Sequence, residues 1–211
     1  MPSPSDVAAL QGVLKKLGVA AGVAVATMWR NASDAQQIKA AYPVVVDPYL
    51  SAAGTITAQW YHELDAESDF AVEVAPLPAA DALTASVGWA FSQADPVDAL
   101  SGSVERHVFG ASRDTVAHNA QREHVKYARY ASATACPWCQ VLATREAAYH
   151  SAEAAVRGHD NCHCMAVPIR GGDTYEPPDY VQQWQQDYRD ARKEVGGNLN
   201  DIVNHMRKTA Q

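Results

Sequence analysis

Hydrophobic residues recur at intervals of three and four along most of the chain, a pattern that predicts amphipathic helices. Ser3 and Asp6 are suited to cap a first helix, which Gly18 is expected to end. Pro43 and Pro48 are expected to interrupt the third helical stretch. Further helices are predicted near residues 19–30, 34–42, 48–64, 79–92, 96–100, 103–127 (with a break at Gly110), 179–195 and 200–208.

The pattern changes after residue 127. Residues 127–131 alternate between apolar and polar as in a strand, and residues 165–169 form a second short apolar run. Residues 70–74 are predicted as either a short strand or an extended linker. The predicted fold is α+β and mostly α-helical, with a small β-hairpin-containing, zinc-knuckle-like module in the C-terminal half. We expect a helical arm or bundle over 1–103, a core with the Cys/His module over 104–175, and C-terminal helices over 176–211.

All four cysteines lie between positions 136 and 164, in Cys136-Pro-Trp-Cys139 and His159-Asp-Asn-Cys162-His-Cys164. Two residues between ligands allow one tight turn to direct both side chains at a single ion. A second such turn completes a tetrahedron. The spacing therefore predicts a structural Zn²⁺ site with a closed ligand set and no assigned catalytic residue.

Five groups compete for the four positions of this metal site. We favour Cys136, Cys139 and His159 together with either Cys162 or Cys164. The alternatives are two disulfides, catalytic thiols, or plain packing; a reducing cytoplasm favours zinc over disulfides. The other nearby histidines and carboxylates, which a catalytic interpretation would need, are His150, His163, Glu146 and Glu153.

Composition narrows the class of protein further. A hydrophobic content of 47% excludes disorder, and a net charge of −7 opposes nucleic-acid binding as a main task. The longest apolar run, residues 19–29, is shorter than a membrane-spanning helix needs, so no membrane partner is expected. A basic stretch is interpreted as the solvated face of a helix, with a local DNA contact as the alternative: Arg122, His124, Lys126 and Arg129.

Several motifs between residues 104 and 195 resemble the core of the phage Mu F-like head morphogenesis proteins, most closely the actinobacteriophage minor capsid branch often labelled capsid maturation protease. Thr134-Ala135 departs from that pattern, since an acidic residue often precedes the first cysteine, and His163 stands where arginine is common. The motifs that carry the resemblance are Ser112-Arg-Asp-Thr115, Asn119, Arg122, Tyr127-Ala-Arg-Tyr130, Cys136-Pro-Trp-Cys139, His159-Asp-Asn-Cys162-His-Cys164 and Pro168.

The resemblance implies a minor capsid or head morphogenesis protein of a tailed phage. Such a protein would be assembled in the host cytoplasm and carried in multiple copies in the virion, in the capsid interior or at the portal vertex. Its expected partners are the portal and the major capsid protein. The alternative is a maturation protease that trims head precursors; a DNA-end or ejected internal protein is a third interpretation.

Overall fold

The computed structural model describes residues 2–144, 158–171 and 176–209. It is mostly helical with one small antiparallel sheet, which confirms the predicted balance of elements. The elements are α1 (Pro4–Asn31), α2 (Ala35–Glu63), α3 (Ala80–Ala90), α4 (Pro96–Arg122), β1 (Lys126–Tyr130), α5 (Pro137–Ala143), β2 (Met165–Ile169), α7 (Tyr180–Val195) and α8 (Leu199–Thr209).

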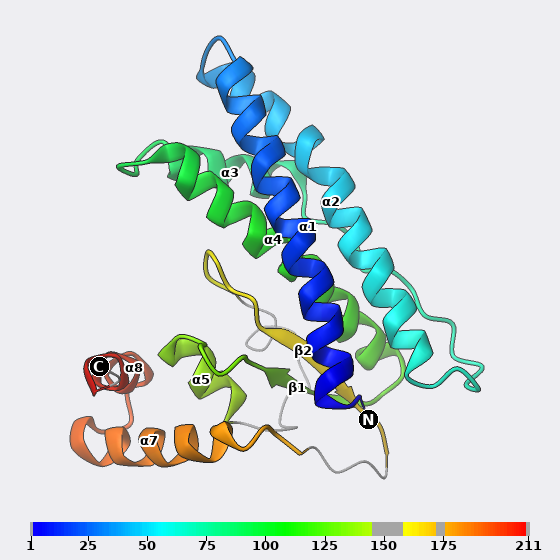
Figure 1. The fold of residues 1–211 in the computed structure, drawn as a ribbon, viewed down its shortest axis with the longest axis vertical. Coiled ribbons are helices and arrows are strands. Elements are labelled where there is room, and N and C mark those ends of the chain that lie inside the picture. The colour runs from blue at the N-terminus through cyan, green and yellow to red at the C-terminus, as the bar shows by residue number, and fades with distance from the viewer. Residues whose placement is uncertain (1, 145–157, 172–175, 210–211) are drawn as a thin grey trace.

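Two long helices, α1 and α2, run antiparallel as an elongated hairpin, and α4 packs against both of them (Figure 1). The short α3 lies against α2 and α4, and β2 lies against α4. Helices α5, α7 and α8 contact one another and form the C-terminal end of the molecule. The sheet therefore sits between the long helices and the C-terminal group.

Helix α1 is continuous, so the predicted end at Gly18 is wrong. Ser3 caps the helix and exchanges hydrogen bonds with Asp6, as the sequence indicated. Gly18 instead lies where α1 meets α4: a Cβ there would stand 3.2 Å from the Cγ of Glu105. Its small size serves a close approach between helices and does not terminate one.

Helix α2 is also continuous, and the predicted interruptions at Pro43 and Pro48 are wrong. A proline inside a helix costs about 3 kcal/mol because a hydrogen bond is lost and the ring clashes with the preceding turn. Tyr42, Val46 and Leu50 are fully buried on one face across this region. Burial on both sides of the prolines outweighs their local cost.

Helix α4 joins the two segments predicted at 96–100 and 103–127, with no break at Gly110. It ends at Arg122, earlier than predicted, and His124 then takes a positive φ of 58° before β1 begins. Gly102 faces the side chain of Asn161, whose atoms would lie 3.1 Å from an added Cβ. The absence of a side chain at Gly102 thus lets the loop that carries His159 and Cys162 approach the helix.

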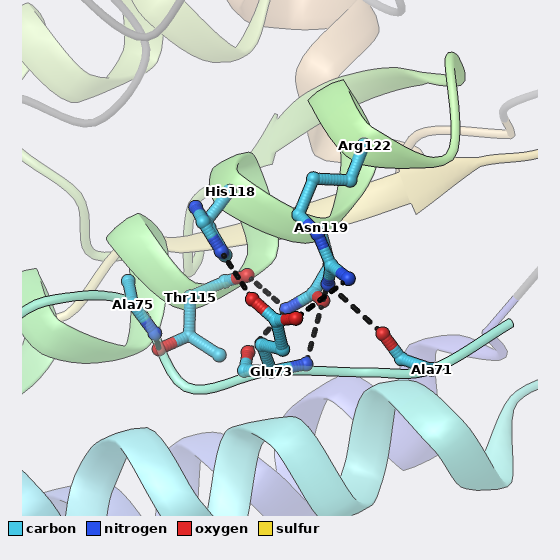
Figure 2. A network of polar contacts seen from close by, with 7 residues as sticks. All are labelled: Ala71, Glu73, Ala75, Thr115, His118, Asn119 and Arg122. Carbon is cyan, nitrogen blue, oxygen red and sulfur yellow. Dashed lines mark hydrogen bonds and ion pairs between the residues drawn. The ribbon is translucent and has the colours of Figure 1, made fainter.

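Residues 70–75 form no strand, which decides between the two predicted alternatives in favour of an extended segment. Side chains of α4 hold this segment in place (Figure 2). Asn119 accepts a hydrogen bond from Glu73 N at 2.9 Å and donates one to Glu73 O at 2.7 Å, as a neighbouring strand would. Arg122 donates to Ala71 O and pairs with the Glu73 carboxylate, and Thr115 accepts from Ala75 N.

The two predicted strands are confirmed as an antiparallel pair, with Tyr127 opposite Pro168 and Tyr130 opposite Met165. Met165 and Val167 belong to the same buried cluster as the apolar residues of α1, α2 and α4. The sheet is therefore anchored in the helical core, and this core crosses the predicted boundary at residue 103. The division into three domains stays a prediction.

Helix α1 is long and apolar enough to cross a membrane by length and composition alone. Core helices of soluble proteins and N-terminal signal sequences meet the same criterion. In the structure α1 packs against α2 and α4. The expectation of no membrane partner stays a prediction.

Candidate metal centre

The first half of the centre is the N-terminus of α5, a short helix that the sequence analysis missed. Cys136 is its N-cap residue, Pro137 occupies the first turn, and Cys139 lies one turn further along. Proline at this position is favourable because its missing N–H needs no partner there. The C-x-x-C spacing therefore sets both thiols on the same end of one helix, with Cys139 buried and Cys136 half-exposed.

The second half is the loop that leads into β2. A turn closes between His159 O and Cys162 N at 3.1 Å, and Asn161 adopts a positive φ of 59° within it. Cys162 and Cys164 are both buried. His163, between them, points away: its ring hydrogen-bonds Glu105 at 3.0 Å and contacts Phe109.

These two halves bring all five predicted donors together. Cys139 Sγ lies 3.6 Å from Cys162 Sγ and 3.5 Å from His159 Nε2. With Zn–S and Zn–N bonds of about 2.3 and 2.05 Å, a zinc tetrahedron has edges of about 3.8 Å between sulfurs and about 3.6 Å between sulfur and nitrogen. Both separations match. Cys136 Sγ lies closer to His159 Nε2, at 2.9 Å, which is a hydrogen-bond distance.

The donors form two overlapping triads that share Cys139. One contains Cys136 and His159, and the other contains Cys162 and Cys164; within each triad the ligand atoms lie within 4.8 Å of one another. All four cysteines are free thiols, and 3.6 Å between sulfurs is far longer than a disulfide bond. The cluster can bind a metal ion, and its sulfur-rich donor set fits a thiophilic one.

His159 is oriented for this role by its own backbone neighbour. Its Nδ1 lies 2.7 Å from the carbonyl oxygen of Asp160. A carbonyl only accepts hydrogen bonds, so Nδ1 carries a proton, and Nε2 faces the thiols. A histidine ligand is commonly held by such a bond from its second nitrogen.

A family model described as VG15 protein matches residues 1–191. The chain belongs to the VG15 protein family. It is therefore a phage protein, and the match includes the N-terminal helices as well as residues 104–191 of the region of the Mu F-like resemblance. No curated protein and no solved structure matches the chain.

The thiols of this VG15 family protein perturb one another. Hydrogen bonds with Cys139 and then His159 lower the pKa of Cys136 to about 4, and the bond with Cys136 raises the pKa of His159 to about 9. Hydrogen bonds from Cys139 and Cys164 also lower the pKa of Cys162. Cys139, which donates in these contacts, has a raised pKa. Thiolate character is thus available on both sides of Cys139.

Two arginines beside the cluster were missed by the sequence analysis. Arg113 of α4 and Arg129 of β1 are each only 1% exposed. The interpretation of the basic stretch as a solvated helix face is wrong for Arg129, which is buried in β1. The nearest signal in the sequence was the alternation around Arg129, which places its side chain on a different face of the strand from Tyr130.

The other members of the basic stretch lie elsewhere. Arg122 pairs with Glu73 at 2.8 Å, and Lys126 is exposed at the start of β1. A local DNA contact by this stretch stays a prediction, and Arg129 would not take part in it because its side chain is buried. His150, Glu146 and Glu153 lie outside the described residues.

Proposed function

We propose that this VG15 family protein is a minor capsid or head morphogenesis protein of a tailed phage, associated with the portal or the inner capsid surface. The observation that carries the proposal is membership of a phage protein family together with the Cys-x-x-Cys and His-x-x-Cys-x-Cys cluster of the Mu F-like pattern. We further propose that the cluster holds Zn²⁺ in a structural role. Five donors for four positions leave no coordination site open for a substrate.

The N-terminal hairpin supports an assembly role. Val13, Val19 and Val23 on α1 and Val44 on α2 are large apolar side chains with 44–73% of their surface exposed. Contact with other virion subunits would remove this surface from water, at about 25 cal/mol per Å². The proposed partners are the portal and the major capsid protein.

The test is the position of the chain in purified particles. Cross-linking mass spectrometry and quantitative proteomics of intact heads should find it in a constant ratio to the portal protein, with cross-links from lysines such as Lys15 and Lys39. A chain absent from mature heads, or present without cross-links to portal or capsid subunits, contradicts the proposal.

One arrangement favours the second candidate, a maturation protease. Ser86 Oγ lies 3.0 Å from His107 Nε2, and Arg106 donates to the same oxygen at 3.1 Å. In the tautomer of His107 that is protonated at Nδ1, Nε2 accepts the Ser86 proton, an arrangement like that of a serine nucleophile paired with its base. The three residues line a hollow of about 570 Å³ next to His159.

Co-expression with the major capsid protein distinguishes the two candidates. Trimming of the precursor that disappears in a folded Ser86→Ala variant would establish the protease. If trimming disappears only in a folded Cys139→Ala variant, the thiols carry the activity. If the wild-type protein does not trim the precursor either, the protease is refuted and the assembly role remains the proposed function.

A further inference from the structure

Two buried arginines lie beside the thiols of the candidate metal centre. Arg129 reaches the cluster from β1, and its Nη2 lies 3.4 Å from Cys162 Sγ and 3.9 Å from Cys139 Sγ. Arg113 reaches it from α4, and its Nη1 donates to the carbonyl oxygen of Cys164 at 3.0 Å. Two guanidinium groups that are almost completely buried thus meet at one group of thiols.

A buried guanidinium requires anionic or strongly polar surroundings because it keeps its charge at any ordinary pH. Neutral thiols are weak acceptors, whereas thiolates bound to a metal carry negative charge. Three thiolates and a neutral imidazole around a divalent ion leave one net negative charge, and four thiolates leave two. The metal-bound cluster therefore has the charge that the arginine contacts favour.

The contacts of Arg129 do not depend on which four donors bind. Cys139 belongs to both triads and Cys162 to the buried one. Arg129 donates toward both sulfurs, so in every ligand set of four it faces at least one metal-bound thiolate.

We propose that Arg129 is a positioning residue of the metal centre, which donates to the metal-bound thiolates of Cys139 and Cys162 and offsets their charge. The inference rests on the proposed zinc site and deepens it. It implies that metal binding and burial of Arg129 stabilise each other, since the thiolates gain a charged donor at the same time as the guanidinium gains charged acceptors.

The experiment measures zinc affinity in competition with a chromophoric chelator, in reducing buffer. We expect Arg129→Met to bind Zn²⁺ about 10–100-fold more weakly than wild type, the usual effect of losing a hydrogen-bond partner of a ligand. Arg129→Lys, which keeps the charge but not the forked donor, should lose less. The matched control is Arg122→Met, which removes a guanidinium that pairs with Glu73 outside the cluster and should leave affinity unchanged.

A second measurement separates positioning from packing. Arg129→Met should lower the melting temperature of the zinc-loaded form more than that of the metal-free form, because metal-bound thiolates are stronger acceptors than neutral thiols. Equal losses of stability with and without metal, or unchanged zinc affinity in both Arg129 variants, would overturn the inference. If Arg129→Met does not fold, an Arg129→Lys variant that binds Zn²⁺ as tightly as wild type would also overturn the inference.

Failure of the underlying site would look different. Wild-type protein that binds neither Zn²⁺ nor Co²⁺, as judged by metal analysis and by the visible bands of tetrahedral cobalt–thiolate, refutes the zinc site and this inference with it. Wild-type protein that binds both ions, alongside Arg129 variants that bind equally well, refutes only the role of Arg129.

Discussion

Replacement of Asn119 by alanine is expected to destabilise the protein by releasing the segment of residues 70–75 from α4. The Asn119 side chain is fully buried and hydrogen-bonds both the backbone N–H and the backbone carbonyl of Glu73, as a neighbouring strand would (Figure 2). It also donates to Thr115 O at 2.8 Å and accepts from Arg122 at 3.2 Å. Asn119→Ala removes all four hydrogen bonds and leaves both backbone groups of Glu73 without this partner.

The magnitude follows from these contacts. Each hydrogen bond contributes about 0.5–1.5 kcal/mol net. The four bonds together therefore contribute about 2–6 kcal/mol. Glu73 is exposed, so water can replace part of what its backbone loses, and the net loss falls at the lower end of this range. We expect a loss of about 2–3 kcal/mol in the free energy of unfolding. For a chain of this size that corresponds to a fall in melting temperature of about 4–12 °C.

Thermal and urea unfolding, followed by circular dichroism, measure this loss. Asn119→Asp, which sets a carboxylate oxygen against the carbonyl oxygens of Glu73 and Thr115, should destabilise the protein at least as much as Asn119→Ala. Gln121→Ala, at an exposed position on the same helix, is the matched control and should have little effect. If Asn119→Ala melts at the same temperature as Gln121→Ala, the amide does not hold the segment and the reasoning is refuted.

Three further outcomes are expected. Chelation of the metal, or Cys139→Ser, should unfold the segments that carry the four cysteines but preserve the circular dichroism signal of α1, α2 and α4, which share a core. Protein that is metal-free as purified, and whose melting temperature does not change with chelator, would contradict this. Gly158→Ala should lower the free energy of unfolding by about 1–3 kcal/mol, because its Cβ would stand 2.5 Å from Arg113 Nη2. Gly12→Ala, whose Cβ would have nothing within 4 Å, should stabilise α1 in the same thermal melt. Burial and then Arg106 lower the pKa of His107 to about 4, so the unfolded chain binds the proton first as pH falls. Stability should therefore decrease between about pH 6.5 and 4 by up to about 3 kcal/mol, and pH-dependent melts of His107→Gln should lack this component.

Much of the secondary structure could be predicted from the sequence because it depends on neighbours in the chain. The cap at Ser3, the helices α3, α7 and α8, and the strands on either side of the cysteines all follow from patterns within a few residues. The five candidate donors could be found for the same reason. Two residues between cysteines fit one turn of backbone whatever surrounds them.

The continuity of the long helices depended on contacts that the sequence does not display. A glycine is found both at helix ends and at close helix crossings, so the sequence around Gly18 does not distinguish the two. The packing of Gly18 against Glu105 of α4 shows that it lies at a crossing. Pro43 and Pro48 likewise break an isolated helix, but α2 has buried residues on both sides of them.

The five candidate donors follow from the sequence because their spacing is local, although helix α5, which carries Cys136 and Cys139, was not predicted. The burial of Arg113 and Arg129 depends on packing between distant segments, since a charged side chain is expected to be solvated unless another segment brings an opposing charge or acceptor near it. For Arg129 the acceptors include thiols from α5 and from the loop before β2. The surroundings of the candidate metal centre thus depend on long-range packing, while its candidate donors follow from spacing along the chain.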